Sequence, residues 1–243
     1  MKNFIDIHSH ILPGVDDGAA GWEMSMRMLK CAADDGISVI VLTPHDKPGH
    51  RHMPFSEMKN RMEKLQCMME EEKIDIKLHM GREVYYRSGM LGNMEEDMTV
   101  TLAGSRYLLV EFNPLADYSY IRNGIYSLLM EGYYPVLAHV ERYRNVCARK
   151  SGINDLIEMG CYMQVNAGSV TGRFGWKTRQ FVKRILKCGQ VHFIATDAHD
   201  LGKRAPALSD CADFISKKYG GDYCRKLFLD NPMDVIRDRE IAL

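Results

Sequence analysis

Short apolar runs alternate with longer segments in which apolar residues recur every three or four positions. The run at 37–43 is almost continuously apolar, which is typical of a strand buried in a parallel sheet. The segment before it carries an apolar stripe with helical spacing and ends at Gly36, a common residue after a helix. Further strands are predicted at 4–10, 76–85, 107–112, 135–139, 162–166 and 191–196. Helices are predicted at about 22–35, 56–72, 118–131, 153–159, 178–187, 208–219 and 223–229, and Asn231-Pro232 opens a last short one.

This alternation predicts an α/β fold with a parallel sheet, because parallel strands need a crossover connection that a helix usually provides. No linker, low-complexity tract or change in composition interrupts the pattern, so residues 1–243 are predicted to form a single domain. Seven strand–helix units favour a TIM-barrel-like (β/α) barrel, and 243 residues are enough to build one. Periodicity alone leaves an open, doubly wound sheet as the alternative.

The charge balance argues against a nucleic-acid-binding protein. Lys and Arg together number 32, as do Asp and Glu, so the formal net charge is zero, and no basic stripe is present. A hydrophobic fraction of 46% without net charge is the opposite of the composition of disordered chains. We therefore expect a folded protein that has no nucleic-acid partner.

The seven cysteines are scattered along the chain. Their odd number and the lack of a C-x-x-C pair argue against a disulfide framework or a zinc ribbon. No cysteine is followed six positions later by arginine, the spacing of the thiol-dependent phosphatases. Free thiols are typical of a reducing compartment. Because no signal peptide and no apolar run of membrane-spanning length is present either, we expect a cytoplasmic protein without membrane insertion.

The first predicted strand ends in two histidines. Side chains alternate between the faces of an extended backbone, so His8 and His10 point the same way and can bind one metal ion. Asp6 is expected on that face as well, where its carboxylate would accept an imidazole N–H and orient the ring. The pair alone is a weak signal, and the later strand ends decide its meaning.

Residue types that bind metals recur at or just after those strand ends. The carboxyl ends of parallel strands meet at one face of a barrel, so residues far apart in the sequence are expected to converge there. Imidazoles and carboxylates without thiolates suit divalent Mn, Fe, Zn or Co, and so many of them indicate more than one ion. The candidates are His8, His10, His45, Glu83, Glu111, His139, Asp197 and His199, together with the acidic turn at 15–18.

The chain resembles a known superfamily in these residues. The polymerase-and-histidinol-phosphatase (PHP) superfamily has similar motifs to Asp6-Ile7-His8-Ser9-His10, the isolated His45, Glu83, Glu111, His139 and Asp197-Ala198-His199. The resemblance is closer to one branch, the CpsB/CapC-type bacterial protein-tyrosine phosphatases of capsular and exopolysaccharide biosynthesis. It is carried by Val15-Asp16-Asp17-Gly18, Ala138-His139-Val140-Glu141-Arg142-Tyr143 and Asp230-Asn231-Pro232. The similarity covers nearly the whole chain in order and spacing.

The resemblance implies a distorted seven-stranded (β/α) barrel of the PHP type that holds three divalent ions, manganese first, with Fe, Zn or Co as alternatives. By matched position, one ion would bind His8, His10, Glu83 and Asp197. A second would share Glu83 and bind Glu111 and His139, and the third would bind Asp17, His45 and His199. The family's two phosphate-binding arginines match Arg142 and Arg204. Asp16 stays open as an alternative to Asp17, and Lys203 as an alternative to Arg204.

The resemblance also implies an activity. We expect a metal-dependent protein-tyrosine phosphatase in which metal-bound hydroxide attacks the phosphoryl group and the two arginines stabilise its charge. The expected substrate is phosphotyrosine on a bacterial tyrosine kinase of polysaccharide assembly, whether of capsule or of another exopolysaccharide. The alternatives are a small-molecule phosphatase of the PHP superfamily, such as histidinol-phosphate phosphatase, and a non-catalytic metal-binding scaffold. The sequence does not fix the oligomeric state.

Other polar residues near these positions carry less information. His50 and His52 are expected to be solvated loop residues, and His79 and His192 to pack within the fold because they lie early in their strands. Tyr85, Tyr86 and Tyr143 follow candidate ligands, and two roles stay open for them. They either flank an aromatic substrate or pack at the rim of the barrel.

Overall fold

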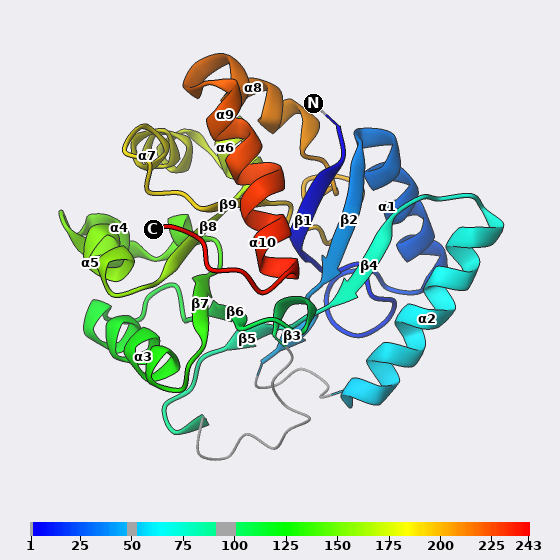
Figure 1. Cartoon of the computed structure of the whole chain (residues 1–243), viewed down its shortest axis with the longest axis horizontal. Coiled ribbons are helices and arrows are strands. Elements are labelled where there is room, and N and C mark those ends of the chain that lie inside the picture. The colour runs from blue at the N-terminus through cyan, green and yellow to red at the C-terminus, as the bar shows by residue number, and fades with distance from the viewer. Residues whose placement is uncertain (1, 48–52, 91–100) are drawn as a thin grey trace.

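Within residues 2–47, 53–90 and 101–243, which this computed structural model describes, nine short strands curl into an arc surrounded by helices (Figure 1). His50 and His52 lie outside the described residues. The strands are β1 (Phe4–Ser9), β2 (Ile37–Leu42), β3 (His45–Asp46), β4 (Lys77–Met80), β5 (Glu83–Tyr85), β6 (Tyr107–Glu111), β7 (Tyr134–Leu137), β8 (Tyr162–Asn166) and β9 (Phe193–Ala195).

The strands form two parallel ladders. One has the order β1-β2-β4, and the other has the order β3-β5-β6-β7-β8-β9. Where β1 meets β9, Ser9 and Ala198 form a single parallel bridge, and the Asp197 N–H donates to the carbonyl of His8 at 2.9 Å. The fold is thus α/β with a curled parallel sheet, as predicted. The seven-stranded closed barrel stays a prediction.

Breaks occur at neighbouring points, directly after one predicted strand and within another. The segment predicted at 37–43 is followed by a break at Pro44, which has no N–H to donate to a ladder. The segment predicted at 76–85 breaks at Gly81, where a Cβ would lie 3.1 Å from Val41 and from Leu102. After the breaks, His45 and Glu83 pair in register on the second ladder. The interruptions therefore carry two candidate ligands onto adjacent strands.

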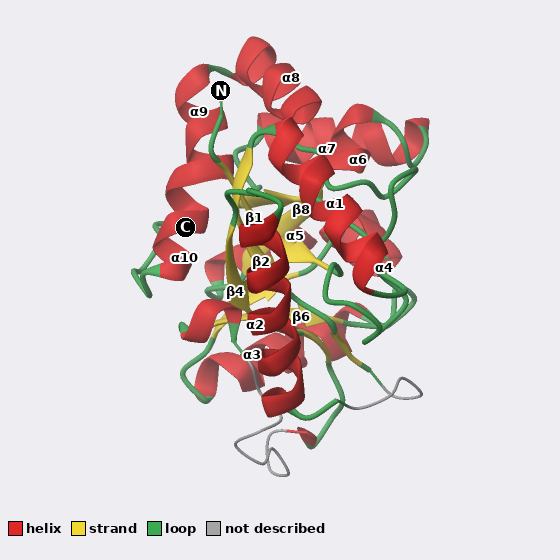
Figure 2. Ribbon diagram, turned by 90° about the vertical axis from the view of Figure 1, so that its right-hand side faces the viewer, coloured by secondary structure: helices red, strands yellow, loops and turns green. Residues whose placement is uncertain are grey.

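Helices cover the outer side of the sheet (Figures 1 and 2). The helix predicted from 56 begins one residue earlier, after Pro54. The sequence pattern did not predict the short elements η2 (Leu102–Gly104), η3 (Val140–Arg142), α4 (Arg144–Ala148) and α6 (Ala167–Thr171). The other helices are α1 (Trp22–Asp35), α2 (Phe55–Glu71), α3 (Tyr118–Met130), α5 (Gly152–Glu158), α7 (Trp176–Lys187), α8 (Ser209–Tyr219), α9 (Gly221–Arg225), the π-helical η4 (Lys226–Asp230) and α10 (Asn231–Ile236).

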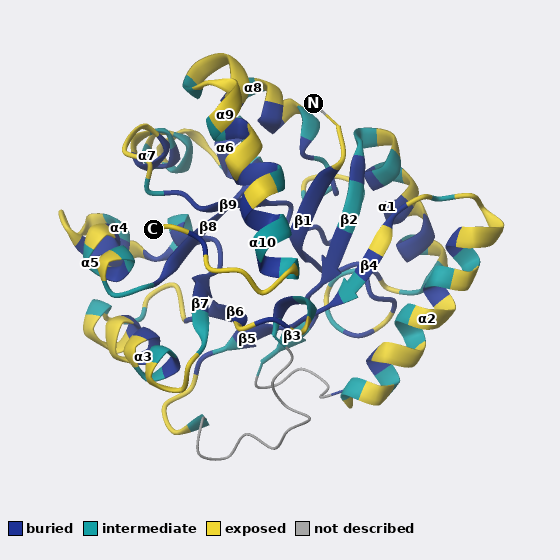
Figure 3. Ribbon diagram, viewed as in Figure 1, coloured by how far each residue is buried: buried dark blue, intermediate teal, exposed yellow. Residues whose placement is uncertain are grey.

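The apolar core has an outer and an inner part, because side chains alternate along each strand. On β6, Leu108 and Val110 belong to the large cluster that includes the helices, whereas Tyr107 and Leu109 belong to a smaller inner cluster. Figure 3 shows the strands mostly buried and the outward sides of the helices exposed. Glu111 continues the inner row of β6, so the interior changes from apolar to polar toward the carboxyl end of the strand.

The C-terminal segment lies against the amino end of this interior. The hydroxyl of Tyr162, the first residue of β8, donates to the carbonyl of Ile241 at 2.8 Å. The hydroxyl of Tyr107, the first residue of β6, donates to the carbonyl of Arg239 at 2.7 Å and accepts from the Ile241 N–H at 3.1 Å. Polar side chains are therefore left to gather at the opposite, carboxyl end.

All seven cysteines are free thiols. Among the described residues, no helix combines the length and the apolar character needed to cross a membrane.

Candidate metal centre

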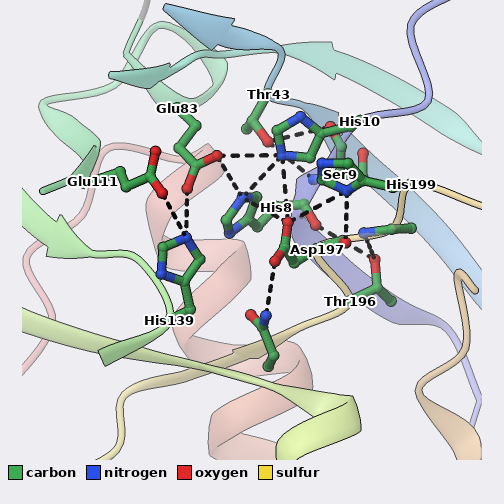
Figure 4. Close-up of polar contacts among 12 residues, drawn as sticks. His8, Ser9, His10, Thr43, Glu83, Glu111, His139, Thr196, Asp197 and His199 are labelled. Carbon is green, nitrogen blue, oxygen red and sulfur yellow. Dashed lines mark hydrogen bonds and ion pairs between the residues drawn. The ribbon is translucent and has the colours of Figure 1, made fainter. Parts of the chain in front are cut away.

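One extra residue in β1 sets the direction of the two histidines. Asp6 pairs with Ile40 and Ser9 with Leu42, so three steps along β1 match two steps along β2. A bulge of this kind re-aims the side chains that follow it. Ile7 can therefore face the inner apolar cluster while His8 and His10 also point inward, toward the other polar side chains (Figure 4).

The bulge also makes the expectation for Asp6 wrong. Its carboxylate accepts hydrogen bonds from the backbone N–H of Thr196 at 3.0 Å and from the Thr196 hydroxyl at 2.5 Å. Gln164 on β8 has the role expected of Asp6, since its Oε1 lies 3.1 Å from His8 Nδ1. The same oxygen accepts the backbone N–H of His139 at 2.7 Å. Gln164 thus positions residues from two sides of the centre.

Glu83, the first residue of β5, lies in the middle of the cluster (Figure 4). Its Oε2 is 2.9 Å from His45 Nδ1 and 3.4 Å from the Nε2 atoms of both His8 and His10. Its Oε1 is 2.8 Å from His139 Nε2. Oε2 is buried and makes no hydrogen bond within the described part of the chain. A buried carboxylate oxygen of this kind needs a further partner, and a metal ion would supply it.

Glu111 and His139 extend the cluster from β6 and from the turn after β7. His139 Nε2 lies 3.8 Å from Glu111 Oε1, and Lys47 Nζ lies 3.4 Å from Glu111 Oε2. His139 has a left-handed backbone with φ of 35°. Such a conformation is costly for a non-glycine residue and is concentrated at functional sites. It directs the imidazole of His139 toward Glu83.

Asp197 connects the cluster of candidate metal ligands to Arg142 and Arg204, the two arginines expected to bind phosphate. It follows β9 and also has a left-handed backbone, with φ of 51°. Its Oδ2 accepts from Arg142 Nη2 at 2.7 Å and from Asn166 Nδ2 at 2.8 Å, and its Oδ1 accepts from Arg204 Nη2 at 2.6 Å. Oδ1 also lies 3.4 Å from His8 Nε2. Asp197 therefore holds both guanidinium groups beside the histidines.

The alternative at Lys203 is not favoured by the geometry. Lys203 Nζ lies over the ring of Phe174, 5.5 Å from its centroid. Arg204, by contrast, reaches Asp197.

The two aspartates of the acidic turn have different surroundings. The Asp16 side chain is 1% exposed, and its Oδ2 lies 2.7 Å from His10 Nδ1 and accepts the backbone N–H of His45 at 3.0 Å. The Asp17 side chain is 56% exposed, and its Oδ1 lies 3.4 Å from His45 Nε2 and 3.5 Å from His199 Nε2. This geometry favours Asp17 as the ligand and gives Asp16 the task of orienting His10.

The protonation states of the buried carboxylates suit metal binding. Burial would raise the pKa of Glu83, but the charge of His8 and the close contacts with the other histidines hold that pKa well below its usual range. Burial likewise opposes the ionisation of Asp197, but His8 and Arg142 hold the pKa of Asp197 far below the ordinary value. For Glu111, burial and the charge of Glu83 raise the pKa. An added cation would relieve this crowding of negative charge.

The pKa values of the histidines are shifted in different directions. Burial lowers the pKa of His139 to about 4, with help from the charge of Arg142, so its imidazole is neutral and can bind a metal. Burial opposes the protonation of His10, but Asp16 raises the pKa of His10 to about 10. The positive charge on protonated His10 neutralises part of the carboxylate charge that a bound cation would otherwise neutralise.

The potential donor atoms fall into three overlapping groups, each with atoms within 4.8 Å of one another. Nitrogen and oxygen donors without thiolate fit divalent ions of the Mn, Fe, Co or Zn type. Every expected ligand except His139 belongs to one of these groups, and His10 and His45 belong to two each, so the division among ions stays a prediction. The groups are His10, Asp17, His45 and His199; His8, His10 and Asp197; and His45, Glu83 and Glu111.

Gln164 is a residue of the centre that was missed in the sequence, whereas Asn166 was noted there as the polar end of its strand. Gln164 and Asn166 lie two apart on β8, and the Gln164 Nε2 donates to Asn166 Oδ1 at 2.9 Å. The available signal was a pair of polar residues with strand spacing inside an otherwise apolar run. Tyr143 is buried and its hydroxyl accepts from the Phe112 N–H at 3.1 Å, so it packs within the fold.

The sequence matches one family model over residues 4–237, that of capsular polysaccharide synthesis, CpsB/CapC. The tyrosine-protein phosphatase CpsB of Streptococcus pneumoniae is 36% identical over 242 residues, which cover 98% of this chain and 100% of that protein. The tyrosine-protein phosphatase YwqE of Bacillus subtilis is 31% identical, with 90% of this chain and 86% of that protein covered.

Solved structures give a consistent result. A chain from the crystal structures of YwqE from Bacillus subtilis and CpsB from Streptococcus pneumoniae, described as unique metal-dependent tyrosine phosphatases, matches with a TM-score of 0.92. That match has 29% identity and covers 98% of this chain and 96% of the other. A lactonase from Listeria monocytogenes matches with a TM-score of 0.60 at 13% identity, over 98% of this chain and 95% of the other, which shows a shared fold alone.

Proposed function

The chain belongs to the CpsB/CapC family of capsular polysaccharide synthesis, and we propose that it is a metal-dependent protein-tyrosine phosphatase. The names of its relatives support the reaction, and the high coverage supports its transfer to this chain. Its substrate would be phosphotyrosine on a tyrosine kinase of polysaccharide assembly, in the cytoplasm. Residues 1–243 would form one domain, a distorted seven-stranded barrel closed by the contact between β1 and β9.

The observation that carries the proposal is the position of Arg142 and Arg204. Both guanidinium groups contact the carboxylate of Asp197, which also lies beside His8. Arginine presents planar, paired N–H donors that match the oxygens of a phosphoryl group. A tetrahedral anion in this position would meet two guanidinium groups on one side and the cluster of candidate ligands on the other.

The centre would hold three divalent ions, manganese first, with Fe, Zn or Co as alternatives. Glu83, with imidazole nitrogens near both of its oxygens, is the best placed side chain to bridge two of them. When bound, the ions would supply hydroxide as the nucleophile at neutral pH and would neutralise the phosphoryl charge. Gln164 and Asp16 would keep His8, His139 and His10 in position.

The arginines would hold the phosphoryl oxygens while the bond to the tyrosine oxygen breaks. The pKa of the departing phenol is about 10, so a phenolate leaves more easily than an alkoxide. The need for a proton donor is correspondingly small. Most of the rate enhancement would come from electrostatic stabilisation of the developing charge.

The proposal is tested with protein loaded separately with Mn, Fe, Co or Zn. We expect it to hydrolyse a phosphotyrosine peptide with a higher kcat/KM than histidinol phosphate. Faster turnover of histidinol phosphate would favour a small-molecule phosphatase of the same superfamily. If no phosphomonoester is hydrolysed with any of these metals, the chain is a metal-binding scaffold and the proposed function is wrong.

A further inference from the structure

A groove with a volume of about 900 Å³ is lined by Arg142 and by none of the candidate metal ligands. One side is the loop after β6, including Leu115, and the other side is formed by α6 and α7 with Phe174 and Lys177. Figure 2 shows α4, α6 and α7 on the same side of the molecule. The volume is within the range of sites that bind organic ligands.

The groove is continuous with the proposed phosphate site through one side chain. Arg142 lines the groove and contacts Asp197 at 2.7 Å. The Arg142 side chain is 35% exposed, so part of it is accessible from the groove. The loop side is fixed to the turn that carries Arg142, because Arg144 N–H donates to the carbonyl of Pro114 at 3.2 Å. A chain attached to a phosphotyrosine held by Arg142 would therefore enter a preformed groove.

The lining is partly apolar. Phe174, Phe181 and Leu115 face the groove, and Leu115 is 64% exposed. An apolar side chain of that size is usually covered when the surface has a partner. Lys203 lies over the ring of Phe174, and Arg184 lies over the ring of Phe181. The groove would thus accept an aliphatic or aromatic side chain.

The charged part of the lining is positive. Arg142, Arg144 and Lys177 line the groove, and Arg144 and Lys177 are exposed. Within the described lining, Glu141 supplies the sole carboxylate, and its Oε1 already accepts the backbone N–H of Asn166 at 3.0 Å. A positive groove next to a phosphate site attracts acidic peptides and repels basic ones.

We propose that this groove binds the residues that adjoin phosphotyrosine in the protein substrate and selects acidic side chains next to an apolar one. The inference rests on the proposed function and deepens it. It assigns the choice among phosphotyrosine sequences to α6, α7 and the loop after β6, rather than to the metal centre.

The test compares two phosphotyrosine peptides of equal length. One carries glutamate and leucine on both sides of the phosphotyrosine, and the other carries lysine in place of each glutamate. We expect the native enzyme to have a kcat/KM about tenfold higher for the acidic peptide at low salt, because each exposed ion pair contributes a small factor. In Lys177→Glu, that ratio should fall about threefold or more.

Lys187→Glu is the matched control, since Lys187 is also exposed on α7 but does not line the groove. Its peptide ratio should equal that of the native enzyme. Equal ratios in the native enzyme, Lys177→Glu and Lys187→Glu would overturn the proposal. Phe174→Ala tests the apolar part, with kcat/KM for the leucine peptide expected to fall about fivefold relative to an alanine peptide.

A binding measurement distinguishes failure of the groove proposal from failure of the proposed function. If free phosphotyrosine and both peptides are not hydrolysed, the phosphatase proposal is wrong whatever the groove does. Fluorescence anisotropy with non-hydrolysable phosphonate analogues of the two peptides then tests the groove alone. Tighter binding of the acidic analogue that is lost in Lys177→Glu supports the groove, and binding without such a difference rejects it.

Discussion

Glu83 connects more candidate ligands than any other side chain of the described cluster, because both of its oxygens lie near imidazole nitrogens. We expect Glu83→Gln to lose metal, with a fall in affinity beyond the roughly 10- to 100-fold that removal of an outer partner costs. Metal content measured by mass spectrometry after gel filtration checks this. Full retention of metal in the variant would contradict a bridging role for Glu83.

The effect expected of a substitution at Arg142 differs from that of Glu83→Gln. Its guanidinium group contacts Asp197 but offers no lone pair to a metal, so Arg142→Ala should keep its metal content. Turnover of phosphotyrosine should fall about 10²- to 10³-fold, as expected when a donor to the transition-state charge is removed. Loss of metal in Arg142→Ala would instead mean that the arginine mainly holds Asp197 in place.

His192 gives a pH dependence that is independent of the metal centre. Burial lowers the pKa of His192 to about 4 from an ordinary value of 6.5, and its Nδ1 accepts the Met163 N–H at 3.0 Å. The unfolded chain therefore binds more protons between these values, so the stability present above pH 6.5 is lost as the pH falls toward 4. At pH 5 the loss from this group is about 2 kcal/mol.

The comparison of native protein with His192→Gln measures that contribution. Urea unfolding at pH 7.5 and pH 5 should show a smaller pH effect in the variant by about 2 kcal/mol. An identical pH effect in both proteins would mean that the ring is not buried in its neutral form.

At the scale of elements, the turn between β1 and α1 is fitted around one glycine. A Cβ on Gly18 would lie 2.0 Å from the His10 carbonyl oxygen and 2.5 Å from His10 Cβ. Gly18→Ala must therefore displace the turn that carries Asp16 and Asp17, and we expect it to cost about 1–3 kcal/mol and to weaken metal binding.

The matched control is Gly21→Ala, at the start of α1. Apart from its chain neighbours, no atom of the described residues lies within 4 Å of a Cβ on Gly21, and its φ of 179° suits any residue. Thermal unfolding and metal content of the two variants give the comparison. A Gly18→Ala protein as stable and as rich in metal as Gly21→Ala would show that the turn can adapt.

The elements also show which parts of the fold could be predicted from the sequence. β8 matches its predicted range, and α1 ends before Gly36 as expected, because strong apolar periodicity and a glycine mark them. The bulge in β1 left no such mark, so Asp6 was assigned to the wrong face. The orienting role of Gln164 depends on a neighbour 156 positions away, and no local pattern records such a contact.

At the scale of the whole molecule, metal binding should be coupled to stability, because the centre joins β1 to strands from every part of the sheet. An ion present at about 100 times its Kd adds roughly 2.7 kcal/mol. For a chain of this length, we expect removal of the ions by a chelator to lower Tm by about 5–10 °C for each ion lost. Added Mn should restore Tm, and Glu83→Gln should respond less to the chelator.

The contact between β1 and β9 also orders events during synthesis. His8 leaves the ribosome early, whereas Asp197, with which it is expected to share an ion, follows 189 residues later. At about 5–20 residues per second, this delay is roughly ten to forty seconds. Through most of that interval the first strand has one neighbour in place and the other still unmade. The ion that His8 and Asp197 are expected to share can therefore gain its full set of ligands only when synthesis is nearly complete.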